Sequence, residues 1–296
     1  MDKRKYLDPS MVAKLNNMQL RARLVVEGYM IGYHKSPYHG FSVEFAEHRS
    51  YGHGDEVRHI DWKLYGKTDR YYVKRFEEET NVRSHILLDS SQSMKFGSGS
   101  VNKLSYATYL SAALTYLMLN QKDAVGLVLF DEKIKKFIPP KSTQSHSNII
   151  MKTLEKVTPG YDTQIRPVLD SMAERIRKRG LIILISDLLD DPEKVLMGLK
   201  HFRYNKQEII VFHLMDPEEY NFDFGERIQF TDMESGESIT TDPWHIRKAY
   251  KNQIDQFNKT YQYGCRDLKI DYVPLFTNQP LDIALNEFLN KRQKLK

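Results

Sequence analysis

The sequence predicts an α/β protein with a doubly wound, mostly parallel sheet and helices on both faces of that sheet. Apolar runs at 86–88, 124–130, 181–185 and 209–214 have the length and composition of strands that are buried on both faces. Between these runs lie segments in which apolar residues recur at helical spacing. Strands that alternate with helices in this way form parallel sheets.

The elements around these runs follow from spacing and from turn residues. We expect helices over roughly 101–121, 149–157, 165–176, 191–202, 246–261 and 281–288, and a last strand over 270–276. Residues 133–138 predict an edge strand that Pro139 and Pro140 end. Residues 217–243 interrupt the alternation, and 228–239 within them predict a small β-hairpin.

An N-terminal helix and a small β segment precede the first buried strand. Asp8 and Pro9 are a typical helix start, and Gly28 ends the apolar stripe that follows. Residues 41–45 alternate between apolar and polar side chains, which predicts a half-buried strand, and 70–79 predict another strand. We therefore divide the chain into residues 1–83 and residues 84–296.

The composition narrows the class of protein. The chain has 296 residues, a net charge of +5 and a single cysteine, Cys265, which excludes an internal disulfide and fits a reducing cytosol. We expect no signal peptide, because no apolar core follows the basic N-terminus. We expect no membrane span either, because no run of about 18 apolar residues occurs. The mild positive charge permits an acidic partner without requiring nucleic acid.

A carboxylate and two hydroxyls follow the strand at 86–88 in the order Asp89-x-Ser91-x-Ser93. One carboxylate with neutral oxygens suits a hard divalent cation such as Mg²⁺. We also expect the helix that follows to direct its positive N-terminal end at the same place. The same residues are also typical of a turn that caps a helix, so both interpretations stay open at this point.

A second carboxylate, Asp187, ends the strand at 181–185. In open α/β sheets, ligands bind beyond the carboxyl ends of the strands, where the strand order reverses. Asp89 and Asp187 should therefore emerge at one edge of the sheet. Two carboxylates that meet there are unfavourable unless a positive charge lies between them.

This arrangement resembles the metal-ion-dependent adhesion site of von Willebrand factor type A domains. The resemblance implies a site for Mg²⁺ or Mn²⁺ with an open position for a partner's carboxylate, and it assigns five ligands: Asp89, Ser91, Ser93, Thr163 and Asp187. Gln92, Asp162 and Leu188 stand where relatives commonly have glycine, so the loop backbones depart from the family pattern.

The segment 49–62 resembles the signature of the bacterial domain-of-unknown-function family numbered fifty-eight, which carries such a domain, and 75–79 fit that signature too. Within it we expect Asp55, Arg58 and Asp61 to form a local ion-pair and turn-capping network around Trp62, with a structural or interaction role. Relatives in this family often accompany MoxR-type AAA+ ATPases. The resemblance thus implies a cytoplasmic adaptor or chaperone-like partner of such a motor, and a binding protein instead of an enzyme.

Two alternatives remain from the residues. An Asp-led loop at the end of a parallel strand also occurs in metal-dependent phosphoryl hydrolases, but those with an aspartate nucleophile need a second Asp where Ser91 stands. Nucleic-acid binding through the basic residues of 1–85 is disfavoured, because acidic residues are interspersed among them. The sequence has no G-x-x-x-x-G-K-[ST] loop, so nucleotide hydrolysis by that route is not expected.

Overall fold

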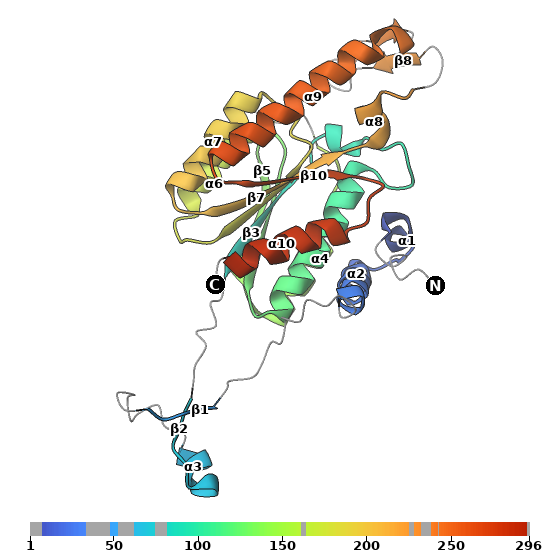
Figure 1. Cartoon of the computed structure of the whole chain (residues 1–296). Coiled ribbons are helices and arrows are strands. Elements are labelled where there is room, and N and C mark those ends of the chain that lie inside the picture. The colour runs from blue at the N-terminus through green and yellow to red at the C-terminus, as the bar shows by residue number, and fades with distance from the viewer. Residues whose placement is uncertain are drawn as a thin grey trace. The chain divides into compact units, whose positions relative to one another are not determined.

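A computed structural model describes residues 8–33, 48–52, 62–74, 82–160, 164–224, 228–231, 238–241 and 243–294 (Figure 1). The chain divides into two compact units, one from residues 1–35 with 82–296 and one from residues 36–81. The first unit is the α/β domain together with the N-terminal helices. The predicted boundary at residue 83 stays a prediction, because grouping by contacts does not test which segment folds by itself.

The α/β unit is built, within the described residues, on a six-stranded sheet in the order β10-β7-β6-β3-β4-β5. Its strands are β3 (Arg83–Asp89), β4 (Ala124–Phe130), β5 (Ile134–Lys141), β6 (Leu181–Ser186), β7 (Glu208–Met215) and β10 (Asp271–Phe276). All neighbours pair in parallel except β5, which runs antiparallel to β4 at one edge. The predicted mostly parallel sheet is confirmed.

The strand order reverses between β3 and β6. From β3 the chain moves outward to β4 and β5, and it then returns to the other side of β3 to add β6, β7 and β10. In sheets of this kind the crevice at the reversal is where ligands bind. Asp89 ends β3, and Asp187 directly follows β6.

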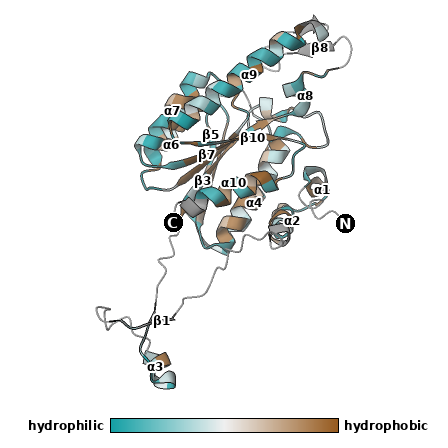
Figure 2. Ribbon diagram, viewed as in Figure 1, coloured by the Kyte–Doolittle hydropathy of each residue, from teal (hydrophilic) through white to brown (hydrophobic). Residues whose placement is uncertain are grey.

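Helices cover both faces of the sheet. In Figure 1, α6 (Ile165–Arg175), α7 (Pro192–Tyr204) and α9 (Pro243–Asp267) lie on one face, and α4 (Lys103–Asn120) and α10 (Asp282–Lys294) on the other. The core of the first face joins Leu87, Leu184 and Val211 of the sheet to residues of α6, α7 and α9. Figure 2 shows hydrophobic residues along the central strands and hydrophilic residues over much of α9. α5 (Gln144–Leu154) packs beside α4.

The N-terminal helix differs in part from its prediction. Asp8 caps the helix start before Pro9 as predicted, but two helices follow, α1 (Pro9–Ala13) and α2 (Met18–Tyr33), and α2 continues past Gly28. Arg21 explains the break, because its guanidinium donates to the backbone oxygens of Ala13 and Leu15 and so satisfies carbonyls that the end of α1 leaves free. It also lies 4.7 Å over the Tyr109 ring of α4.

The remaining elements are short. In the second unit, β1 (His48–Ser50) pairs antiparallel with β2 (Tyr72–Lys74), and α3 (Trp62–Thr68) lies between them in the chain. The strand expected at 41–45 lies outside the described residues. In the first unit, α8 (Pro217–Asn221) precedes the antiparallel pair of β8 (Ile228–Thr231) and β9 (Ser238–Thr241), which confirms the predicted hairpin. Across the described parts of the chain, each helix is too short or too polar to cross a bilayer.

Candidate functional site

Three neighbouring strands deliver carboxylates to one edge of the sheet. β3 ends in Asp89, β6 is followed by Asp187, and β7 is followed by Asp216. The three strands are parallel neighbours, since β6 pairs with both β3 and β7. The predicted convergence of Asp89 and Asp187 is therefore present, and Asp216 is a third carboxylate that sequence reasoning missed.

The carboxyl group of Asp89 is fully buried and hydrogen-bonded on both oxygens. Ser186 Oγ donates to Oδ2 at 2.6 Å, and the backbone N–H of Ser91 donates to Oδ1 at 2.9 Å. Burial and the nearby charge of Asp187 raise the pKa of Asp89 from 3.8 to about 7, although these hydrogen bonds oppose the shift. A carboxyl group held so far from its ordinary pKa is typical of functional sites.

Ser91 and Ser93 place their hydroxyls side by side. Their Oγ atoms are 3.0 Å apart, and Ser91 is buried. A short 3₁₀ turn, η3 (Ser93–Lys95), and a loop follow them, and the helix expected at 101–121 is α4, which begins at Lys103. The contribution of the positive N-terminal end of this helix to the site stays a prediction. The oxygen donors at Ser91 and Ser93 are their hydroxyls.

Asp187 is engaged by a lysine that sequence reasoning also missed. Lys103 Nζ donates to Asp187 Oδ2 at 2.8 Å and to the two carboxylate oxygens of Glu219 at 2.9 and 3.1 Å. Burial would lower the pKa of Lys103, but the charges of Asp187 and Glu219 outweigh burial and raise it. Lys103 is thus a buried cation that bridges β6 and α8.

Asp216 has a structural role at the same edge. Its carboxylate accepts from the backbone N–H and the hydroxyl of Ser98 and from the hydroxyl of Thr277, and it caps the start of α8. Burial alone would raise its pKa, but the hydrogen bonds from Ser98, Glu218 and Thr277 lower it. Asp216 therefore ties the loop before α4 and the end of β10 to α8.

The loop after Asp187 adopts a strained backbone. Leu188 has φ of 54°, a left-handed conformation that glycine adopts without strain, and its side chain is fully buried. Its backbone is held on both sides, since its N–H donates to Ser186 Oγ and its carbonyl accepts from Tyr261 Oη at 3.0 Å. Leucine in this left-handed conformation is thus accommodated by burial and by these two hydrogen bonds.

Thr163, the remaining predicted ligand, lies outside the described residues. The described residues on either side of it are attached near the site: Gly160 N–H donates to the carbonyl of Ser90 at 2.7 Å, and Ile165 N–H donates to Asp190 Oδ2 at 2.9 Å. The assignment of Thr163 as a ligand stays a prediction.

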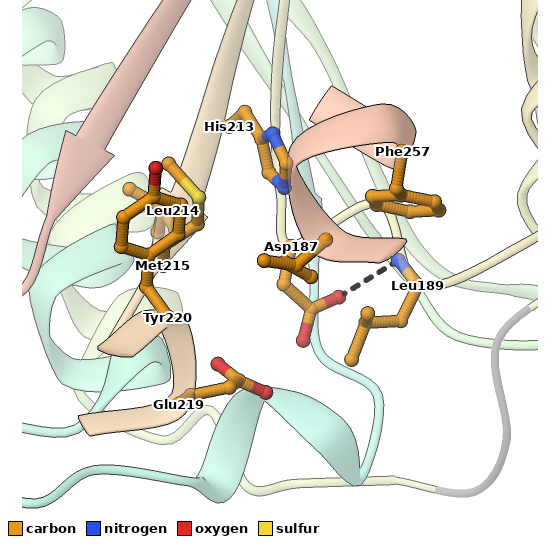
Figure 3. A pocket seen from close by; sticks show the side chains of 9 residues that line it. Asp187, Leu189, His213, Leu214, Met215, Glu219, Tyr220 and Phe257 are labelled. Atoms are coloured by element: carbon orange, nitrogen blue, oxygen red, sulfur yellow. Dashed lines mark hydrogen bonds between the residues drawn. The ribbon is translucent and has the colours of Figure 1, made fainter. Parts of the chain in front are cut away.

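A small apolar pocket lies beside Asp187 (Figure 3). It opens to solvent, and its walls include Leu214, Met215 and Phe257. Figure 3 shows the carboxylates of Asp187 and Glu219 turned toward one another below the ring of His213. Burial lowers the pKa of His213 to about 4, and its Nδ1 lies 2.6 Å from Tyr272 Oη.

The residues of the family signature belong to the second unit. Asp55, Arg58 and Asp61 lie outside the described residues, so the predicted network among them stays a prediction. Trp62 begins α3 and is 57% exposed, with its ring edge-on to Tyr65 at 6.1 Å. An exposed tryptophan of this kind fits the predicted structural or interaction role without deciding between the two.

The oxygen donors fit a divalent cation in part. Asp89, Ser91 and Ser93 bring one carboxylate and two hydroxyls to one turn, which suits Mg²⁺ or Mn²⁺. Asp187 fits less well, because one of its oxygens is bonded to Lys103. In the described segments no three His, Cys, Asp or Glu side chains gather around a common point, and a hydroxyl-rich site is not of that type.

Comparison with known proteins gives one family and a set of distant relatives. The sequence pattern described as "Protein of unknown function DUF58" matches residues 47–260. An uncharacterized protein of Mycobacterium tuberculosis is 24% identical over 233 residues, which cover 77% of this chain and 73% of that protein.

Two solved structures illustrate the likeness of fold. An aerotolerance-related membrane protein from Bacteroides fragilis superposes with a TM-score of 0.50 at 20% identity, over 71% of this chain and 99% of that one. The von Willebrand factor domain of the pilus tip protein Mfa5 from Porphyromonas gingivalis gives a TM-score of 0.42 at 13% identity, over 73% and 96% of the two chains. These likenesses concern the fold alone, and the predicted doubly wound, mostly parallel α/β fold is confirmed.

Proposed function

This chain belongs to the DUF58 family, and from that premise we propose that it is a protein-binding domain that recognises an acidic group through a divalent cation. Its von Willebrand factor type A-like fold suggests a protein-interaction domain. The proposed binding surface is the edge of the sheet at the carboxyl ends of β3 and β6, where the strand order reverses.

The observation that carries the proposal is the state of Asp89. A fully buried carboxyl group whose pKa is raised to about 7 is unfavourable in its ionised form, and a cation at the same place would remove that penalty. Its neighbours Ser91 and Ser93 supply further oxygens, with Thr163 and Asp187 as the remaining proposed ligands. When bound, Mg²⁺ or Mn²⁺ would supply an open coordination position for a carboxylate of the partner.

The proposed partner is a MoxR-type AAA+ ATPase, for which this chain would act as an adaptor or chaperone-like factor. The support is the resemblance to relatives that accompany such motors, together with the absence of a phosphate-binding G-x-x-x-x-G-K-[ST] loop from this sequence. Because such a motor consumes ATP, we propose that the interaction takes place in the cytoplasm.

The test is retention of a purified MoxR-type ATPase of the same organism on the immobilised full chain, with Mg²⁺ or with EDTA. We expect retention by the wild type in Mg²⁺ only, and none by Asp89→Asn in either condition. Asp123→Asn is the matched control, because Asp123 is also a buried aspartate beside a central strand, but it precedes β4 and so lies at the opposite end of the sheet. Equal retention by all three proteins in both conditions would refute the proposal.

We propose binding without catalysis, on the ground that Ser91 stands where aspartate-nucleophile hydrolases have a second aspartate. The alternative is tested with p-nitrophenyl phosphate and Mg²⁺. Turnover by the wild type that Asp89→Asn abolishes would favour a phosphoryl hydrolase instead.

A further inference from the structure

Lys103 is buried at the candidate site, and its donors are fully used. Its side chain has no exposed surface, and it is the first residue of α4. An ammonium group has three N–H donors, and three carboxylate oxygens lie within 3.1 Å of Nζ, one from Asp187 and two from Glu219. The lysine–carboxylate cluster of Lys103, Asp187 and Glu219 is therefore a closed hydrogen-bonded unit.

This cluster does not balance the charges at the sheet edge. One ammonium faces two carboxylates, and Asp89 adds a third carboxyl group on the neighbouring strand. This edge of the sheet thus keeps a net negative charge that a second cation would offset. However, the carboxylate that such a cation would share with Asp89, that of Asp187, is already hydrogen-bonded to Lys103.

We infer that Lys103 sets the cation affinity of this site, because its ammonium competes with a divalent cation for the carboxylate of Asp187. The inference rests on the proposed cation role of Asp89, Ser91 and Ser93, and it adds a residue that opposes the metal. In the absence of metal, Lys103 holds Asp187 in place. When a divalent cation binds, its charge and that of Lys103 repel one another, which weakens binding of the metal alone.

A purely structural role explains the cluster less well. Lys103 joins α4 to α8, but Asp216 already ties the loop before α4 to the start of α8 through Ser98. A buried ion pair is also weak evidence for stability, since an apolar replacement of similar volume is often neutral. The position of the ammonium on a strand-end carboxylate therefore points to a role at the site.

The test measures Mn²⁺ binding to the full chain by isothermal titration calorimetry. The principal variant is Lys103→Met/Glu219→Gln, which removes one charge of each sign, keeps the side-chain volumes and frees Asp187. We expect it to bind Mn²⁺ at least tenfold more tightly than the wild type.

The chain offers a matched control at the opposite edge of the sheet. Lys291 is also buried between two carboxylates, Glu208 at 2.9 Å and Asp271 at 3.1 Å, which begin β7 and β10. Lys291→Met/Glu208→Gln makes the same change in charge away from the site, and it should leave Mn²⁺ affinity unchanged.

The outcomes separate the inference from the function on which it rests. Suppose that the wild type and Lys103→Met/Glu219→Gln bind Mn²⁺ equally, and that adding Asp89→Asn to either protein abolishes binding. The competition between Lys103 and the cation is then refuted, while the proposed cation site stands. If neither protein binds Mn²⁺, the inference is overturned and the cation part of the proposed function fails with it. A tenfold gain in Mn²⁺ affinity that also appears in the Lys291 control would show that the gain does not depend on the position of Lys103. That outcome would overturn the inference.

Discussion

The hydroxyl of Ser186 donates to the carboxylate of Asp89 at 2.6 Å and thereby joins the ends of two strands that lie 97 residues apart in the chain. The same Oγ accepts the backbone N–H of Leu188, the residue with the left-handed backbone. One serine therefore positions both the buried carboxyl group and the loop that carries Asp187.

Ser186→Ala is expected to lower the free energy of unfolding by about 2–4 kcal/mol, because it leaves a buried carboxylate oxygen and a buried N–H without their partner. Ser90→Ala is the control, since the hydroxyl of Ser90 donates only to a neutral acceptor, the carbonyl of Phe130. That control should lose about 1 kcal/mol. Urea unfolding at pH 7 measures both values, and equal losses would contradict the importance of the Asp89 contact.

Asp89→Asn is expected to stabilise the metal-free protein at pH 8. The folded-state pKa of Asp89 is raised from 3.8 to about 7, so above pH 7 the folded protein carries an unfavourable ionised group. This penalty is relieved as the pH falls from about 7 toward 4, and it is absent in the variant. We expect a gain on the order of 2–4 kcal/mol at pH 8 that disappears near pH 4.

Thermal unfolding of wild type and Asp89→Asn in EDTA between pH 4 and pH 8 checks this prediction. A variant that is less stable than the wild type at pH 8 would mean that Asp89 mainly caps its turn. That is the alternative which the Asp89-x-Ser91-x-Ser93 pattern leaves open. If the variant is instead more stable than the wild type and Mg²⁺ no longer raises its stability, the carboxyl group of Asp89 serves binding at a cost in stability.

The sequence predicted the strands well and the site in part, for a physical reason. Runs such as 86–88 and 181–185 are buried on both faces, so their composition alone identifies them, and the residues at their ends must emerge at one edge. Lys103 has no such signal, because a lysine in the first turn of a helix is usually exposed to solvent. Its partners Asp187 and Glu219 lie 84 and 116 residues further along the chain, and only the packing of α8 on the sheet edge brings them together.

His85 is expected to make the protein acid-sensitive. It lies on β3, buried, with Nδ1 lacking a hydrogen-bond partner, and burial with the charge of Arg83 lowers its pKa from 6.5 to about 4. The folded protein therefore binds a proton less readily than the unfolded chain, so stability falls as the pH drops from about 6.5 to 4. The loss is at most about 3 kcal/mol.

His85→Leu removes this contribution and replaces the unpaired nitrogen with an apolar side chain. We expect the variant to lose less stability than the wild type between pH 6.5 and pH 4, as measured by urea unfolding at several pH values. Parallel stability profiles for the two proteins would show that His85 is protonated in the folded state as easily as in the unfolded chain.

Lys103→Met alone is expected to be far less stable than the double variant Lys103→Met/Glu219→Gln. The single change leaves the buried carboxylates of Asp187 and Glu219 without their cation, which costs about 3–5 kcal/mol in comparable buried pairs. The double variant removes one of those charges as well and should regain much of that loss. Chemical unfolding in EDTA measures the free energy of unfolding of both proteins without metal. In a separate measurement with Mn²⁺ and without EDTA, Mn²⁺ should stabilise the single variant more than the wild type, because a divalent cation is the nearest substitute for the missing ammonium. If the single variant proves as stable as the wild type without metal, Asp187 and Glu219 do not need Lys103. The ammonium of Lys103 would then interact with Asp187 too weakly to compete with a divalent cation.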